Sequence, residues 1–342
     1  MVPNSNLERL SRYLENVSAL SKEYSASVFW ENRLGDFKTV IKKQNIQTIS
    51  MDNIEDIVKS LGYHSDHKTS EEILSSIDKT LQLLDKTLKK TNSETAGIEK
   101  TDWEHLNALY FLKRYKLLEL YTAFLKDMQI ASNMSIARHF YYAYLLGNLM
   151  RKYLNSAASN VLEIGAGAAI LAVFLTRKGL VKNYCIVDLP EMLINSSNTI
   201  LSYVPDAQIY FNEPVQADTL SEATRFWLFS PQNISMIPDG FFQLALNFNS
   251  FMEMDKAARD SYIELIYRTG SASALFVNSN RRQAALPQRD GSSFDNHPLF
   301  YPYHSDDLVA MWEPDEFQQA TRSNFGTTPL SFSILRVAVI NR

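Results

Sequence analysis

The chain has 342 residues, of which 45% are hydrophobic, so it is long enough for two domains with ample material for a core. Its formal net charge of −4 excludes an overall positive field that would hold a nucleic-acid backbone or an anionic membrane. No stretch reaches the roughly 18 apolar residues that span a bilayer, no secretory leader is evident, and the single Cys185 cannot form an intrachain disulfide. We therefore expect a cytoplasmic protein without nucleic-acid or membrane partners.

The first 150 residues have helical periodicity. The clearest segment repeats apolar residues at steps of three and four, at Ile73, Ile77, Leu81, Leu84 and Leu88. Thr69 and Glu72 have the spacing of a capping box, which predicts where that helix starts. Two further helices are expected over 103–128 and 135–154. We therefore predict an α-helical domain over 1–150, which would act as a lid over the acceptor, as a homodimer interface, or as both.

From about residue 158 the pattern changes, because strand-like apolar runs begin to alternate with helical ones. This alternation is typical of a parallel sheet covered by helices. The expected strands are 160–164, 184–188, 208–211, 242–247 and 274–278, followed by a helix near 317–320 and a closing strand over 332–340. The sequence thus predicts a second, α/β domain over 151–342.

A glycine turn follows the first of these strands, in the sequence Glu163-Ile164-Gly165-Ala166-Gly167. Glycine lets the backbone approach a ligand closely, and the helix that follows presents free amide groups at its N-terminus. The dinucleotide fingerprint requires a glycine at its sixth position, where this chain has Ile170. The turn therefore favours a nucleotide-like ligand other than a pyrophosphate.

Asp188 ends the next expected strand, 21 positions after Gly167. A carboxylate there accepts hydrogen bonds from both hydroxyls of a ribose. The alternative is that Asp188 caps the helix that begins at Leu189 and Pro190, because proline favours the first helical turn. One side chain is able to do both.

These motifs resemble class I S-adenosylmethionine-dependent methyltransferases, and among them the bacterial sugar O-methyltransferases. The resemblance covers roughly 135–342 and is carried by 161–167, by 186–193 and by Asn247-Phe248-Asn249-Ser250-Phe251-Met252-Glu253-Met254. It implies a Rossmann-like domain with a mostly parallel seven-stranded sheet, preceded by the helical domain. It also implies S-adenosylmethionine as the cofactor and S-adenosylhomocysteine as its product.

The same resemblance assigns residues to the cofactor. Glu163, Gly165, Ala166 and Gly167 would surround its methionine part, and Asp188 with Leu189 would hold the ribose. Phe211 and Asn212 would border the adenine, although many methyltransferases have an acid where this chain has Asn212. Ala169 likewise stands where a third glycine often occurs.

Polar residues follow the fourth expected strand, at the edge of the sheet where ligands bind. Asn247, Asn249 and Glu253 are candidates for holding the cofactor's amino group or orienting an acceptor hydroxyl, and the alternative is that such residues cap the loop and the next helix. The plant phenol O-methyltransferases have a similar aspartate-leucine-proline motif, but their catalytic histidine would fall near Phe251, where this chain has none.

A long polar stretch over 278–307 is expected to lie on the acceptor side. Its candidate substrate-binding residues are Asn278, Asn280, Arg281 and Arg282. His297 and His304, together with Glu253, are the candidate general bases for removing a proton from the acceptor. The alternatives are ordinary hydrogen-bonded histidines and arginines that only solvate the loop.

Three functions remain open from the sequence. They are methyl transfer to a sugar or glycan hydroxyl, methyl transfer to another small natural product, and cofactor binding as an NAD-type oxidoreductase or without catalysis. No histidine and carboxylate pair has ligand spacing on one helix, so no metal is expected.

Overall fold

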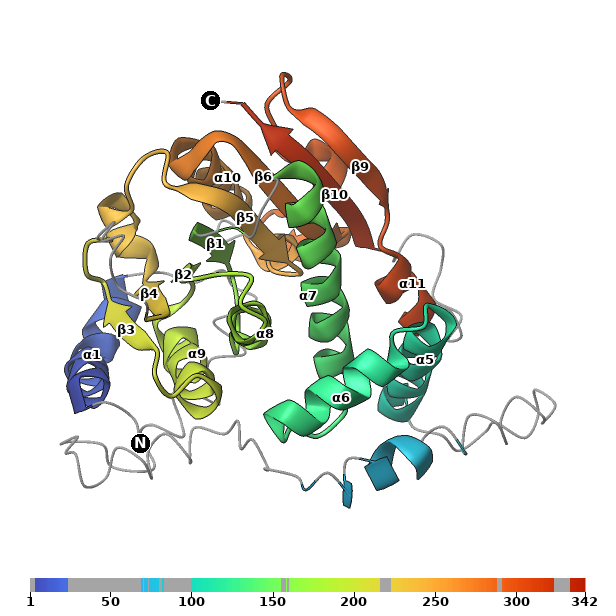
Figure 1. Cartoon of the computed structure of the whole chain (residues 1–342). Coiled ribbons are helices and arrows are strands. Elements are labelled where there is room, and N and C mark those ends of the chain that lie inside the picture. Colours follow the sequence, from blue (N-terminus) through green and yellow to red (C-terminus); the bar gives the residue numbers. More distant parts are fainter. Residues whose placement is uncertain are drawn as a thin grey trace. The chain divides into compact units, whose positions relative to one another are not determined.

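The computed structural model describes residues 4–23, 69, 71–72, 74–79, 82, 100–154, 158, 160–215, 223–287, 291–322 and 333–341 (Figure 1). The chain divides into two compact units. The first consists of Met1–Tyr63, Gly147–Glu313 and Ser333–Arg342, and the second of His64–Leu146 and Pro314–Phe332. This division differs from the expected boundary at residue 150, because each unit combines segments that are distant in the sequence.

The first unit is built on an eight-stranded sheet with the strand order β3-β4-β2-β1-β5-β6-β10-β9. Neighbouring strands from β3 to β6 pair in parallel, whereas β10 runs antiparallel to β6. The strands are β1 (Asn160–Ile164), β2 (Asn183–Val187), β3 (Gln208–Phe211), β4 (Arg225–Phe229), β5 (Phe242–Phe248), β6 (Gly270–Arg281), β9 (Leu308–Pro314) and β10 (Ser333–Ile340). A separate antiparallel pair consists of β7 (Gln283–Pro287) and β8 (Ser293–Asn296).

Helices α8 (Ile170–Arg177), α9 (Pro190–Tyr203) and α10 (Lys256–Thr269) connect the parallel strands. Ile263 and Ile266 of α10 belong to the same buried cluster as Leu162 of β1 and Phe276 of β6. Because side chains alternate along a strand, Glu163 points to the opposite face of the sheet from Leu162. Both faces of β1 are buried, so its apolar residues Val161, Leu162 and Ile164 share the strand with a buried acid, Glu163.

Helix α1 (Asn4–Glu23) also belongs to this unit and lies beside β3 and α9 (Figure 1). The Asn6 side chain donates to the carbonyl of Ala207 at 2.6 Å and accepts from the amide of Ile209 at 3.0 Å. These two bonds engage backbone groups along β3, the edge strand of the sheet, which would otherwise be open to pairing. The first helix of the chain therefore stabilises the α/β unit.

The second unit contains α5 (Lys100–Arg114), α6 (Leu118–Met128), most of α7 (Met134–Tyr153) and α11 (Glu316–Arg322). Buried Tyr142 of α7 donates to Asp315 at 2.6 Å and accepts from Gln318 of α11 at 3.0 Å. The predicted capping box is confirmed, because Thr69 and Glu72 exchange bonds between side chain and backbone. The helix expected over 103–128 is instead two helices, interrupted where Lys116 has a φ of 57°.

The predicted strands over 160–164, 184–188, 208–211, 242–247 and 274–278 are all present, and so is the closing strand. The expected number of seven was wrong, because the sheet has eight strands. The sequence analysis did not identify β4 or β9. Strand β4 is buried on both faces, and its short apolar run has no alternation to reveal it. Strand β9 is almost entirely exposed and lies at the other edge of the sheet.

Candidate cofactor and acceptor site

The glycine turn joins the carboxyl end of β1 to α8, and Gly165 begins it with a φ of 74°. Its amide donates to the carbonyl of Val187 at 2.8 Å, which ties the turn to the end of β2. A Cβ at this position would overlap the Oγ and Cβ atoms of Ser250. Glycine is therefore required here by the packing of the protein itself.

Gly167 has a φ of 60°, but a Cβ added there would meet no atom within 4 Å. Its amide donates to Oδ2 of Asp188 at 2.8 Å, and its carbonyl accepts from the hydroxyl of Ser196 at 2.7 Å. Ala166, beside it, is half-buried. The bonds to Asp188 and Ser196 thus hold the backbone of the turn, and the space where a Cβ of residue 167 would lie is open.

Ala169, where a third glycine often occurs in the family, has a φ of 55° and precedes the first residue of α8. This left-handed conformation is the one that glycine adopts most readily. The backbone at Ala169 therefore has the conformation expected of a third glycine, although the residue is an alanine.

Asp188 follows β2 and is held by two backbone amides. Oδ2 accepts from Gly167, and Oδ1 accepts from Leu189 at 2.8 Å. Burial raises its pKa to about 6, against the two amide bonds, with smaller contributions from the negative charges of Glu191 and Glu253. The bond to Leu189 is the local interaction expected of a cap, and each carboxylate oxygen keeps a second lone pair for a ligand.

Glu163 is 3% exposed on β1, and its Oε2 accepts from the hydroxyl of Tyr184 on β2 at 2.8 Å. Burial raises its pKa to about 7, the Tyr184 bond lowers it, and the charge of Asp188 raises it further. Glu163 and Asp188 therefore lie close enough to interact. Four carboxyl groups lie around the glycine turn, those of Glu163, Asp188, Glu191 and Glu253, and the raised pKa values of Glu163 and Asp188 mean that these two release their protons less readily than exposed acids.

Strand β4 changes the surroundings of the two residues expected to border the adenine. It lies between β2 and β3, so Phe211 and Asn212 lie one strand farther from Asp188 than the sequence implied. Phe211 is 8% exposed and stacks on Tyr13 of α1. Asn212 still reaches the end of β4, because its Oδ1 accepts from the amide of Ser230 at 2.9 Å. A role for either residue at the adenine stays a prediction.

Amide side chains dominate the ends of β5 and β6. Buried Asn247 donates to the carbonyl of Ile164 at 2.9 Å and to the hydroxyl of Ser250, and its Oδ1 accepts from Asn280 at 2.8 Å. Ser250 also donates to Ile164 at 3.0 Å. This network connects β5 and β6 to the residue that precedes Gly165. Asn249 has a φ of 61°, and its amide donates to Ser279 at 2.8 Å.

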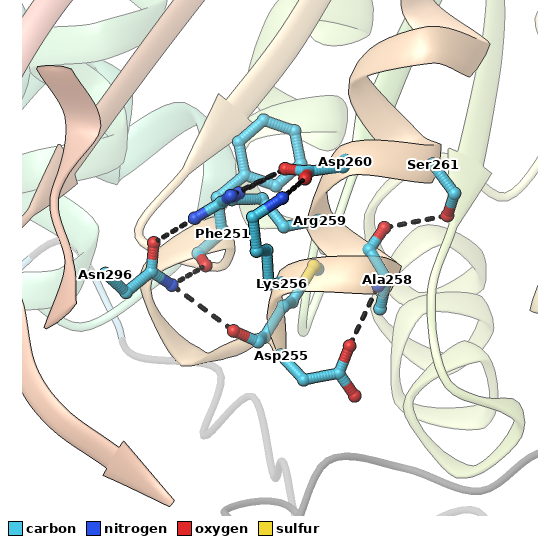
Figure 2. Close-up of polar contacts among 9 residues, drawn as sticks. Phe251, Asp255, Lys256, Ala258, Arg259, Asp260, Ser261 and Asn296 are labelled. Atoms are coloured by element: carbon cyan, nitrogen blue, oxygen red, sulfur yellow. Dashed lines mark hydrogen bonds and ion pairs between the residues drawn. The ribbon is translucent and has the colours of Figure 1, made fainter. Parts of the chain in front are cut away.

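Glu253 lies in the short helix η2 (Phe251–Glu253), which a distant side chain holds in place. Asn296, at the end of β8, donates to the carbonyls of Phe251 at 2.8 Å and Met254 at 3.2 Å. Arg259 of α10 in turn donates to Asn296 at 2.8 Å and pairs with Asp260 (Figure 2). Both Arg259 and Asn296 are buried, so the segment that carries Glu253 is anchored from two other elements.

The predicted substrate-binding residues are not brought together in one arrangement. Asn280 belongs to the Asn247 network, and Asn278 accepts from the hydroxyl of Tyr303 at 3.0 Å. Buried Nδ2 of Asn278 has no hydrogen-bond partner among the described residues. Arg281 is half-buried at the end of β6, whereas Arg282 pairs with Asp295 across the β7–β8 hairpin.

The two histidines have structural contacts of their own. Nδ1 of His297 accepts from the amide of Leu299 at 3.1 Å and so caps the short helix η3 (Pro298–Phe300). Burial lowers the pKa of His297. The exposed ring of His304 stacks on Tyr267, with their centroids 3.6 Å apart. A catalytic role for either histidine stays a prediction.

Sequence reasoning missed three residues that shape this site. Tyr184 was expected only as part of a strand, Asn296 only as a neighbour of His297, and Tyr13 was not considered at all. Their contacts bridge between 21 and 177 positions of the chain, so no local pattern identifies them.

Among the residues described, no group of three or more histidine, cysteine or acidic side chains could hold a metal ion. In the same parts of the chain, none of the helices is both long and apolar enough to cross a membrane.

No protein-family model and no curated protein matches the chain. Similar solved structures include the cyclase SpnF, at 12% identity and a TM-score of 0.39 over 58% of this chain and 81% of that one. The N-methyltransferase NodS from Bradyrhizobium japonicum WM9 has 13% identity and a TM-score of 0.38 over 59% and 97% of the two chains. A 1,6-didemethyltoxoflavin-N1-methyltransferase from Burkholderia thailandensis, with bound S-adenosylhomocysteine, has 13% identity and a TM-score of 0.37 over 67% and 90%. Similarities this low carry no inference about the activity of this chain.

Proposed function

We propose that this chain binds S-adenosylmethionine at the turn from Gly165 to Gly167 and transfers its methyl group to a small-molecule acceptor. The observation that carries this proposal is the combination of open backbone at Gly167 with the carboxyl groups of Glu163 and Asp188 beside it. Such a combination suits a cationic ligand with a ribose.

The residues present fit this cofactor. Asp188 would accept hydrogen bonds from the ribose hydroxyls with its remaining lone pairs, and Glu163 would favour the positively charged methionine part. Gly165 and Gly167 would let the backbone approach the ligand, with Leu189 beside the ribose and Asn247 and Asn249 at the next strand end. When bound, the cofactor supplies an electrophilic methyl group on a sulfonium.

The charge of the site separates this cofactor from a dinucleotide. A carboxylate in the place of Asp188 suits the ribose of either ligand. A pyrophosphate at the same turn would in addition meet the carboxyl group of Glu163, and like charges at close range oppose binding. A sulfonium and an ammonium group would instead be attracted. The site therefore favours S-adenosylmethionine over NAD, in agreement with Ile170 at the sixth position of the turn.

Glu253 is the predicted base that we place nearest to the cofactor, because its charge acts on Asp188. Asn296 bonds to the carbonyls of Phe251 and Met254, so the backbone that carries Glu253 has a defined position relative to the end of β5. A base there would remove the acceptor's proton as the new bond forms, an effect of about 10²- to 10⁴-fold. Anchoring the base also contributes to catalysis, because it limits the geometries that must be searched.

For the acceptor we propose a sugar or glycan hydroxyl, supported by the resemblance of the sequence motifs. Asn278, Asn280, Arg281 and Arg282 are the residues proposed to contact it. Another natural product is the alternative acceptor. A homodimer and a cytoplasmic location remain predictions from the sequence.

Binding calorimetry tests the cofactor first, with S-adenosylhomocysteine and NAD as separate titrants. Binding of S-adenosylhomocysteine without a response to NAD is expected, and the reverse result would overturn the proposal. Incubation with labelled S-adenosylmethionine and a panel of nucleotide sugars and glycan fragments then tests the acceptor. Label in a sugar product supports the acceptor class, whereas label in another natural product would assign the alternative.

A further inference from the structure

Helix α1 reaches the turn that carries Asp188, although the two are far apart in the sequence. The buried hydroxyl of Tyr13 donates to the carbonyl of Pro190 at 3.1 Å. Pro190 is the first residue of α9 and lies two positions after Asp188. Tyr13 thus contacts the segment that supplies Leu189, whose amide donates to the Asp188 carboxylate.

Tyr13 is itself held firmly. Its ring stacks on Phe211 at the end of β3, with centroids 4.5 Å apart and an interplanar angle of 20°. Arg9, one helical turn earlier, donates to the carbonyl of Ile209 at 3.1 Å and lies 4.2 Å over the ring of Tyr210. Together with the two bonds of Asn6, these contacts fix α1 along β3.

The Tyr13 hydroxyl is a constant donor. Burial raises its pKa, and the negative charges of Glu191 and Asp188 raise it further. It therefore stays protonated at neutral pH and remains the donor to the carbonyl of Pro190, two positions after Asp188.

We propose that Tyr13 is a positioning residue of the cofactor site, which holds the turn at residues 188–190 and thereby sets the direction of the Asp188 carboxylate. This inference rests on the proposed function, because it concerns how Asp188 meets the ribose. A carboxylate that must reach two hydroxyls tolerates little misplacement, so a donor that fixes its turn contributes directly to affinity. The N-terminal helix is then part of the cofactor site.

A double-mutant cycle on the full-length chain tests this inference. The variants are Tyr13→Phe, which keeps the stacked ring and removes only the hydroxyl, Asp188→Asn, and the two combined. Calorimetry with S-adenosylhomocysteine should show that Tyr13→Phe alone weakens binding roughly fivefold to tenfold, the effect of one hydrogen bond. In the Asp188→Asn background the same change should have an effect of less than about twofold, because the two residues act together.

The matched control is Asn16→Ala, on the exposed side of the same helix, where the side chain donates to the carbonyl of Arg12 at 2.8 Å. It should leave affinity unchanged. Hydrogen exchange of the ligand-free protein gives an independent readout, since Tyr13→Phe should accelerate exchange at the amides of Leu189 and Met192.

Each outcome decides a different question. An unchanged affinity in Tyr13→Phe, or an equal loss with and without Asp188, would overturn this inference alone. No binding of S-adenosylhomocysteine by the wild type would overturn the proposed function and this inference with it.

Discussion

The ends of β1 and β2 differ in chemistry from the ends of β5 and β6, although all four strands are parallel neighbours in one sheet. The first pair carries Glu163 and Asp188, whose pKa values are raised to about 7 and about 6. The second pair carries Asn247 and Asn280: Asn280 donates to Asn247, and Asn247 donates to the carbonyl of Ile164. Burial disfavours the charged form of both acids, so a cationic ligand would stabilise their ionised state. The two amides already have partners within the protein and hold the glycine turn in shape.

The two glycines of the turn repeat this contrast on a smaller scale. Gly165 is packed against Ser250 and Gly167 faces open space, although both have positive φ. Gly165 is therefore needed for packing in the folded protein, whereas Gly167 leaves room for a ligand. Variants at these positions should separate stability from affinity.

The largest effect is expected from Gly165→Ala. The new methyl would collide with Ser250 and the residue would keep a left-handed backbone, so the free energy of unfolding should fall by about 2 to 5 kcal/mol. Urea denaturation measures this change. Gly179→Ala is the control, because Gly179 has a φ of 66° and no neighbour within 4 Å, and it should lose only the left-handed contribution of about 1 to 2 kcal/mol.

Combining Gly165→Ala with Ser250→Gly removes the two colliding atoms and should restore part of the lost stability. A double variant no more stable than Gly165→Ala would contradict the packing explanation for Gly165.

Asn247→Ala tests the amide network. The substitution removes the acceptor of the buried Asn280 amide and the Asn247 bond to the Ile164 carbonyl, although Ser250 still donates to Ile164, so unfolding free energy should fall by about 2 to 4 kcal/mol. Gln243→Ala, on the same strand but only half-buried, is the comparison variant. If Asn247→Ala kept full stability and lost only ligand affinity, the distinction between the two pairs of strands would be wrong.

Asp188→Asn should have the opposite profile. The variant loses one of the two backbone amide bonds of Asp188, because Nδ2 of asparagine cannot accept, but it also removes a buried negative charge, so the free energy of unfolding should fall by only about 1 kcal/mol. S-adenosylhomocysteine should bind roughly tenfold to hundredfold more weakly, as expected for lost charge-assisted hydrogen bonds. Calorimetry and thermal melting measure the two quantities. The control is Asp206→Asn at an exposed position, and equal affinity in both variants would mean that Asp188 serves only as a cap.

The smallest effect is a dependence on pH. Because the folded-state pKa values of Glu163 and Asp188 are raised, the folded protein retains protons that the unfolded chain releases as pH rises from about 4 to 7. Stability of the ligand-free protein should therefore fall across this window. Affinity for cationic S-adenosylmethionine should rise roughly tenfold from pH 6 to pH 8 as Glu163 ionises. Glu163→Gln should remove most of that rise, and a pH-independent affinity in the wild type would argue against Glu163 at the cofactor.

The sequence predicted the parts of this site that depend on local pattern. Spacing along the sequence is enough to predict the strand β1, the two glycines and the acid at the end of β2. In the structure β1 pairs with β2, and Gly167 donates to Asp188. Ala169 stands where the resemblance leads us to expect a glycine, and its backbone has the left-handed conformation, with a φ of 55°.

The remaining features depend on distant partners. Strand β4 enters the sheet between β2 and β3 without any signal in its five buried residues. The anchoring of Glu253 needs Asn296, more than 40 positions later, and the anchoring of Asp188 needs Tyr13 from the first helix. Such contacts follow from tertiary packing, which periodicity does not encode.

A crystal structure with bound S-adenosylhomocysteine tests the central claim most directly. We expect the ribose hydroxyls to lie within hydrogen-bonding distance of the Asp188 carboxylate, and the ligand to contact the backbone at Gly167. A ligand bound elsewhere, or crystals that stay ligand-free at saturating concentration, would contradict it.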